Sequence, residues 1–130
     1  MGRDGIGWTY SKNLEIEIGE KSKVKRICSL INVKTEAIAE YERIHADVWP
    51  DVLAALKRAN VQNYSIYRYG NLLVSYMEYV GTDYEGDMAS IAADSRTQEW
   101  WKITDPMQSP LPDKLEQEWW HAIPEVFHLN

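Results

Sequence analysis

The chain has 130 residues, a formal net charge of −6 at pH 7, and 45% hydrophobic and 26% charged residues. This length allows one domain with a core and is too short for two ordinary domains. No segment gathers Lys and Arg into a basic face, and no run approaches the roughly 18 apolar residues of a membrane span, so we expect neither a nucleic-acid nor a membrane partner.

Residues 1–22 are predicted to form a polar, glycine-containing extension that is poorly ordered or lies over the surface. Alternation at residues 14–18 is compatible with a short edge strand inside it. The first residues lack the apolar stretch of a signal peptide, so we expect the protein in the cytoplasm. The domain itself is expected to span residues 23–130.

The domain is predicted to begin with a buried strand and an interrupted helix. Residues 24–33 are rich in β-branched and apolar side chains, which is typical of a buried strand. Thr35 is a candidate cap for the helical pattern that follows. Pro50 disfavours helical geometry at the residue before it, so we expect a break near residues 48–49 and a second helix that starts at the proline.

The second half is predicted to form a hairpin, two helices, a loop and a last strand. Two alternating runs meet at Gly70-Asn71, which predicts an antiparallel hairpin with a tight turn. Three prolines indicate a loop after the second helix, and Trp119 and Trp120 are expected on a short helical turn. The predicted bounds are 63–69 and 72–79 for the hairpin strands, 83–93 and 97–104 for the helices, and 125–129 for the last strand.

The order strand, helix, strand, strand, helix, strand predicts an α+β fold of the ferredoxin-like β-α-β-β-α-β type. Helices cover only one face of such a sheet, so the other face must meet something else. We expect a second copy of the chain to cover it, which gives a two-fold symmetric homodimer, a dimeric α/β barrel.

Tyr41 and His45 lie four residues apart on a predicted helix and should share a face. Histidine transfers protons near neutral pH. His45 precedes the helix break, and because a negative helix end favours its protonated form, we expect an acid. A lone histidine on a helix is also typical of a surface or satisfied core residue, and the residues alone leave that alternative open.

Aromatic residues are the other candidates for a site. Adjacent helical residues point about 100° apart, so one of Trp100 and Trp101 can face the core while the other lines a pocket. Tyr64 starts a predicted strand whose alternation places it with Ile66 on one face. For the tryptophan pair and for Tyr64, packing in the core explains the pattern as well as a binding site does.

No metal or cofactor is expected from the sequence. His45 and Asp47 are too few for a zinc site, and no HExxH motif is present. There is no glycine-rich phosphate loop, and Cys28, the single cysteine, is expected to be a small buried hydrophobic residue. A histidine beside aromatic walls would suit small-molecule proton transfer without either.

Five stretches carry a resemblance to a known family: Glu40-Tyr41…His45…Trp49-Pro50, Asn63-Tyr64-Ser65-Ile66-Tyr67, Asn71-Leu72-Leu73, Trp100-Trp101-Lys102…Thr104-Asp105 and Glu125-Val126-Phe127. In this order and spacing they resemble the L-rhamnose mutarotase family, from about residue 25 to residue 129. The resemblance implies a ferredoxin-like domain that dimerises through its sheets and interconverts the α and β anomers of a free 6-deoxy sugar. By position it implies that His45 is the proton donor and that Tyr41, Tyr64, Trp100 and Trp101 bind the sugar.

Two stretches depart from the family pattern, at residues 46–48 and at residues 106–123 with their second Trp-Trp pair. Both are expected to border the pocket. L-rhamnose is therefore the favoured sugar, and L-fucose or a related sugar is the alternative. A monooxygenase and a non-catalytic metabolite-binding module on the same scaffold are the alternatives from other functional classes.

Overall fold

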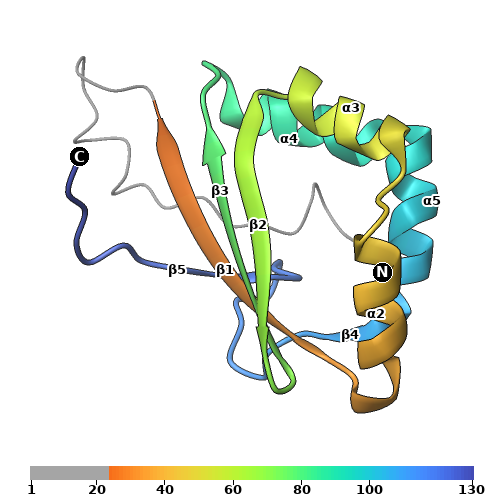
Figure 1. Cartoon of the computed structure of the whole chain (residues 1–130). Coiled ribbons are helices and arrows are strands. Elements are labelled where there is room, and N and C mark those ends of the chain that lie inside the picture. Colours follow the sequence, from red (N-terminus) through yellow and green to blue (C-terminus); the bar gives the residue numbers. More distant parts are fainter. Residues whose placement is uncertain (1–23) are drawn as a thin grey trace.

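A computed structural model describes residues 24–130 of the protein (Figure 1). The predicted extension over residues 1–22 and its edge strand lie outside the described residues. The helices are η1 (Thr35–Ala37), α2 (Ile38–His45), α3 (Pro50–Arg58), α4 (Tyr84–Ala93), α5 (Ser95–Thr104) and η2 (Asp105–Met107), where η marks a 3₁₀ helix. The strands are β1 (Lys25–Val33), β2 (Val61–Tyr69), β3 (Leu72–Tyr79), β4 (Gln108–Ser109) and β5 (His121–Ile123).

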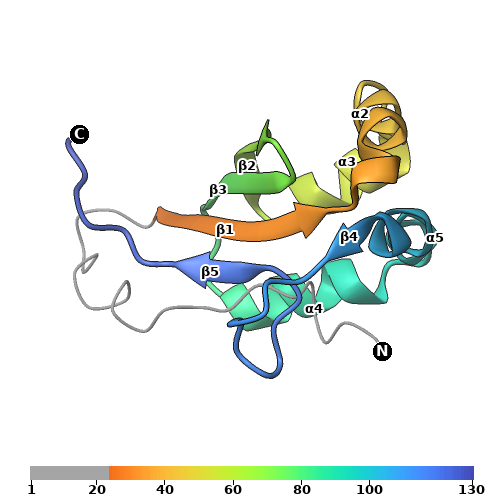
Figure 2. The same ribbon diagram turned by 90° about the horizontal axis from the view of Figure 1, so that it is seen from below.

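The five strands form one curled antiparallel sheet in the order β2-β3-β1-β4, with β5 also paired to β1. The helices lie on one side of this sheet, and the C-terminal tail leaves on the other side (Figures 1 and 2). The fold is therefore of the α+β class, as the sequence predicts.

Alternate residues of the central strands face the helices and form the core. In β1, Ile27 and Ile31 are buried, whereas Cys28 and Leu30 between them are partly exposed on the opposite face. The same alternation runs along β3. Each large side chain buried in this way stabilises the fold by about 1.5–3 kcal/mol, so the core depends on β1 and β3 keeping their register.

The predicted helix break before Pro50 is confirmed. Trp49 has an extended backbone (φ −58°, ψ 133°), and Pro50 occupies the first turn of α3, where its missing N–H costs no hydrogen bond. The predicted capping role of Thr35 is wrong, because the chain enters α2 through a 3₁₀ turn that already contains this residue. The Thr35 hydroxyl instead accepts a hydrogen bond from the Asn71 side chain at 3.0 Å.

The antiparallel β2–β3 hairpin is confirmed, with Gly70 at φ +60° in its turn. Strand β2 starts two residues earlier than predicted and carries a bulge between Gln62 and Ser65. Asn63 has φ +48° there, and its side-chain amide donates to Glu78 at 2.7 Å. Because the bulge adds a residue, Tyr64 packs against the core cluster that contains Val61 instead of pointing to the opposite face.

The predicted strand over residues 125–129 is wrong. Strand β5 lies earlier, where His121–Ile123 pair with Cys28–Leu30 of β1, and Pro124 then ends the ladder because it has no N–H to donate. Beyond it, Val126 is 94% exposed and Phe127 is 79% exposed. The predicted helical turn at Trp119 and Trp120 is also absent, since both residues lie in a bend that leads into β5.

Replacing Asn63 should separate the cost of its backbone conformation from the loss of its side-chain bond. Both Asn63→Val and Asn63→Gly remove the bond to Glu78, but only glycine adopts a positive φ without strain. We expect Asn63→Val to lower the free energy of unfolding by about 1 kcal/mol more than Asn63→Gly. Urea denaturation at one fixed protein concentration measures this difference, and equal losses would contradict a role for the positive φ.

Candidate active site

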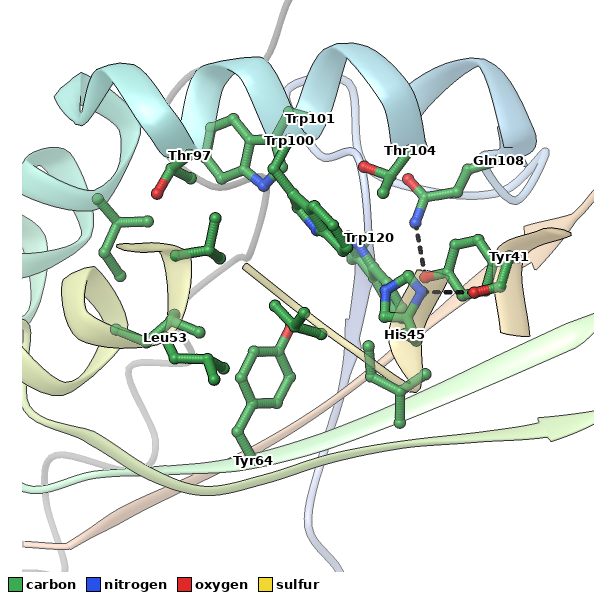
Figure 3. A pocket seen from close by; sticks show the side chains of 15 residues that line it. Tyr41, His45, Leu53, Tyr64, Thr97, Trp100, Trp101, Thr104, Gln108 and Trp120 are labelled. Atoms are coloured by element: carbon green, nitrogen blue, oxygen red, sulfur yellow. Dashed lines mark hydrogen bonds between the residues drawn. The ribbon is translucent and has the colours of Figure 1, made fainter. Parts of the chain in front are cut away.

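A cavity of about 280 Å³ lies among α2, α3, α5 and strand β2 (Figure 3). This volume is at the lower end of the range for small-molecule sites, so it suits a ligand of about one sugar ring. The lining residues come from the four α-helices, the loop between α2 and α3, strands β2 and β4, and the bend before β5. They are Tyr41, His45, Val48, Val52, Leu53, Leu56, Tyr64, Ile66, Ile91, Thr97, Trp100, Trp101, Thr104, Gln108 and Trp120.

All five sequence-predicted residues line this cavity. Tyr41 and Trp100 are buried, at 4% and 6% exposure, and Trp101 and Tyr64 are both partly buried against the same core cluster. Both tryptophans of α5 line the cavity, because it extends along the face of this helix and meets both rings (Figure 3).

The protonation pattern of His45 follows from one hydrogen bond. Its Nδ1 lies 2.7 Å from the backbone carbonyl oxygen of Tyr41. A carbonyl can only accept, so Nδ1 carries a hydrogen and donates it. In the neutral ring Nε2 is then the unprotonated nitrogen. Figure 3 shows this second nitrogen on the side of the ring away from the Tyr41 carbonyl, where it is directed into the pocket.

Burial lowers the pKa of His45 below the ordinary value of 6.5, and the hydrogen bond to Tyr41 opposes this shift only in part. The expectation that the helix end favours a protonated ring is therefore wrong in direction. Taking the imidazolium out of water disfavours it by more than the hydrogen bond to the Tyr41 carbonyl favours it. At neutral pH the pocket thus contains a neutral imidazole whose Nε2 can accept a proton.

Aromatic rings hold His45 from two sides. The Tyr41 ring is stacked on the imidazole with centroids 4.1 Å apart, and Trp100 meets its edge at 5.4 Å. Trp49 in turn packs against Trp100 with ring centroids 5.1 Å apart, and the Arg96 guanidinium lies 4.2 Å from the centre of the Trp49 ring. These contacts restrict the orientation of the imidazole and so fix where Nε2 points.

His45, Tyr41 and Gln108 lie together at one end of the pocket, and Leu53 and Thr97 lie at the other (Figure 3). The Thr97 hydroxyl donates a hydrogen bond to Asp94 at 2.8 Å, so its proton is already used there. Tyr64 rises from the sheet between these ends, opposite the tryptophans of α5. A ligand bound here would place its reacting polar group beside the histidine and an apolar group near α3.

Sequence reasoning missed Gln108, Trp120 and two threonines of α5 as lining residues. The two stretches that depart from the family pattern gave a partial signal, because both are expected to border the pocket. They contribute Val48, Gln108 and Trp120 to its lining. His121 and His128 do not line it. Cys28 lies on the far face of the sheet, partly buried, and burial raises the pKa of its thiol.

Within residues 24–130, no group of three or more His, Cys, Asp or Glu side chains is arranged to hold a metal ion. The helices of the same residues are all too short or too polar to cross a membrane.

The fold and the pocket define an α+β protein with an aromatic-lined cavity for a small ring-shaped ligand. The family model of L-rhamnose mutarotases matches residues 26–129, and the chain belongs to this family. It is thus a sugar mutarotase, an isomerase that interconverts anomers.

Relatives named for two sugars resemble the chain at nearly full length. An L-fucose mutarotase of Xanthomonas campestris pv. campestris is 34% identical over 113 residues, which are 82% of this chain and 90% of the relative. An L-rhamnose mutarotase of Ligilactobacillus salivarius is 33% identical over 110 residues, 81% of this chain and 97% of the relative. The crystal structure of an L-rhamnose mutarotase from Formosa agariphila shares the fold, with a TM-score of 0.64, 21% identity, and coverage of 82% of this chain and 99% of that one.

The titration of His45 is a direct test of its environment. Because burial disfavours the charged imidazolium, we expect the midpoint of the His45 ring titration to lie below 6.5 in the folded protein. NMR of the histidine Cε1–H signals against pH measures it, and the same titration in urea should return to about 6.5. A folded-state midpoint above that of the unfolded chain would contradict the neutral imidazole.

Proposed function

We propose that the protein interconverts the α and β anomers of a free 6-deoxy-L-hexose, with L-rhamnose the first candidate, and that His45 transfers the proton without a cofactor. The observation that carries this proposal is the hydrogen bond from His45 Nδ1 to the Tyr41 carbonyl, which leaves Nε2 facing a pocket of sugar-ring size. Tyr41, Tyr64, Trp100 and Trp101 bind the sugar, because aromatic faces stack on its apolar C–H face.

Mutarotation requires two proton transfers. In the opening step, His45 Nε2 accepts the proton of the anomeric hydroxyl, the C1–O5 bond breaks, and O5 receives a proton from the Tyr41 hydroxyl or from a water molecule. The open-chain aldehyde rotates about its C1–C2 bond. Closure on the opposite carbonyl face then reverses both transfers, with the imidazolium of His45 acting as the acid. His45 thus starts as a base, and the donor role implied by the family resemblance belongs to the reverse transfer.

The polarity of the pocket supports a 6-deoxy sugar. With the anomeric carbon beside His45, C6 extends from C5 on the other side of the ring oxygen, and the cavity lining from α3 offers the apolar side chains Val52, Leu53 and Leu56. A methyl group at C6 suits that surface, whereas a hydroxyl there would lose hydrogen bonds to water. L-fucose is the second candidate, since the relative that is 34% identical is named for it.

The central experiment measures anomer exchange of L-rhamnose and of L-fucose by saturation-transfer NMR. Wild-type protein should accelerate exchange, and His45→Ala should lower kcat/KM by at least about 100-fold, the usual contribution of an acid–base group. The ratio of kcat/KM between the two sugars ranks them.

L-mannose and L-galactose serve as matched control sugars, since they differ from L-rhamnose and L-fucose only by the hydroxyl at C6. We expect slower turnover of each control than of its 6-deoxy counterpart. Full activity of folded His45→Ala would overturn the role of this residue. Sugar binding without acceleration would point to a binding module, and oxygen consumption would point to a monooxygenase.

We further propose that the β-α-β-β-α-β order is ferredoxin-like and that the open face of the sheet pairs with a second copy. The open face carries Leu30, Val74, Tyr76 and Tyr67 in alternation with the core positions, and Tyr67 is 65% exposed. The exposed apolar tail leaves on the same side (Figure 2). An apolar surface of this extent is typical of an interface.

Disruption of this face should separate the subunits. Val74 lies in the middle of the open face, so Val74→Lys would bury charges against each other in a symmetric pair. We expect sedimentation velocity to give a dimer for the wild type and a monomer for the variant. A wild-type protein that stays monomeric at high concentration would contradict the proposed assembly.

A further inference from the structure

We propose that Gln108 is a positioning residue of the active site and that the loop between β4 and β5 controls it through Trp119. This inference rests on the proposed function, since it assigns to the loop the orientation of the Tyr41–His45 pair. Neither Gln108 nor Trp119 is among the residues to which the family resemblance gives a role.

The direction of the hydrogen bonds through Gln108 is determined by Trp119. The indole Nε1 of Trp119 lies 2.7 Å from Gln108 Oε1, and an indole N–H can only donate. The amide oxygen must therefore face Trp119, and the amide nitrogen faces Tyr41, where it donates to the phenol oxygen at 3.1 Å. Without the indole, the amide has no such reason to keep this orientation.

The main chain at Gln108 is fixed to the sheet. The residue belongs to β4 and pairs with Val33 of β1, and the Lys34 N–H donates to the Met107 carbonyl at 2.8 Å. Its side chain is buried, at 5% exposure of the residue. The Gln108 side-chain amide is buried and hydrogen-bonded through both its oxygen and its nitrogen, so it has little freedom to rotate. A shift of Trp119 would therefore move the amide and, with it, the Tyr41 hydroxyl.

The loop that carries Trp119 is held by a buried carboxylate. Glu118 accepts hydrogen bonds from the backbone N–H groups of Leu115 and Ala122, at 2.8 and 3.2 Å, and contacts His121 Nδ1 at 2.7 Å. The two following residues, Trp119 and Trp120, pack against the core cluster that contains Tyr41. The loop is thus a fixed wall of the pocket.

The contact reaches the reacting nitrogen through ring stacking. Tyr41 stacks on His45 with an angle of 25° between the rings, so a shift of the phenol changes the tilt of the imidazole and the direction of Nε2. Because the phenol oxygen accepts from Gln108, its own O–H bond points elsewhere. Both effects act on proton transfer more than on sugar binding.

The experiment is a double-mutant cycle with separate values of kcat and KM for the better of the two sugars. Trp119→Phe keeps an aromatic ring but removes the N–H, and Gln108→Met keeps the length of the side chain but removes both bonds. We expect each to lower kcat by about 10-fold, with KM within about twofold. The double variant should be no worse than Gln108→Met alone, because the indole acts only through the amide.

Gln117→Ala is the matched control, since this side chain is exposed on the same loop, and it should leave kcat unchanged. Circular dichroism and thermal unfolding establish that each variant is folded, and a purely structural role would lower thermal stability without the selective loss of kcat. Unchanged kcat in both single variants, or additive losses in the double variant, would overturn the inference alone. A wild-type protein that accelerates no sugar would overturn the proposed function and this inference with it.

Discussion

The geometry of the site depends on the end of helix α2 in front of Pro50. The proline disfavours helical geometry at Trp49, so a continuous helix through this point is excluded, and α2 ends with His45 as its last residue. At that place the imidazole can turn back onto the Tyr41 carbonyl, and Trp49 can pack against Trp100. One backbone constraint therefore sets the tautomer of the histidine and closes the aromatic wall around it.

Local patterns in the sequence are sufficient to predict most of the helices and strands that form this arrangement. Periodicity predicted β1, both halves of the broken helix, the hairpin, α4 and α5, because each of these is encoded by its own apolar positions and turn residues. The final strand was misplaced because residues 125–129 alternate well, whereas β5 is only His121–Ile123 and is selected by its contact with β1. Such a short pairing leaves no periodic signal of its own.

The prediction of the site from the sequence is limited in the same way, because residues brought in by long-range contacts leave no periodic pattern. Tyr41 and His45 were found because helical spacing alone brings them together, but Gln108 and Trp120 reach the pocket through long-range folding of a loop without periodicity. The protonation of His45 was predicted in the wrong direction for a related reason. A helix end can be inferred from sequence, whereas the burial that outweighs it depends on Trp100 from a distant helix.

The placement of Gln108 and Trp120 has a consequence for how this scaffold can diversify. The region from β4 to β5 forms part of the pocket, yet it adds only the short strands Gln108–Ser109 and His121–Ile123 to the edge of the sheet. The long β1–β3 ladder and the histidine lie outside it. Substitutions in this loop that keep the Trp119–Gln108 hydrogen bond can therefore change the shape of the pocket while the fold stays intact, which makes the loop a natural place for new ligand preferences to evolve.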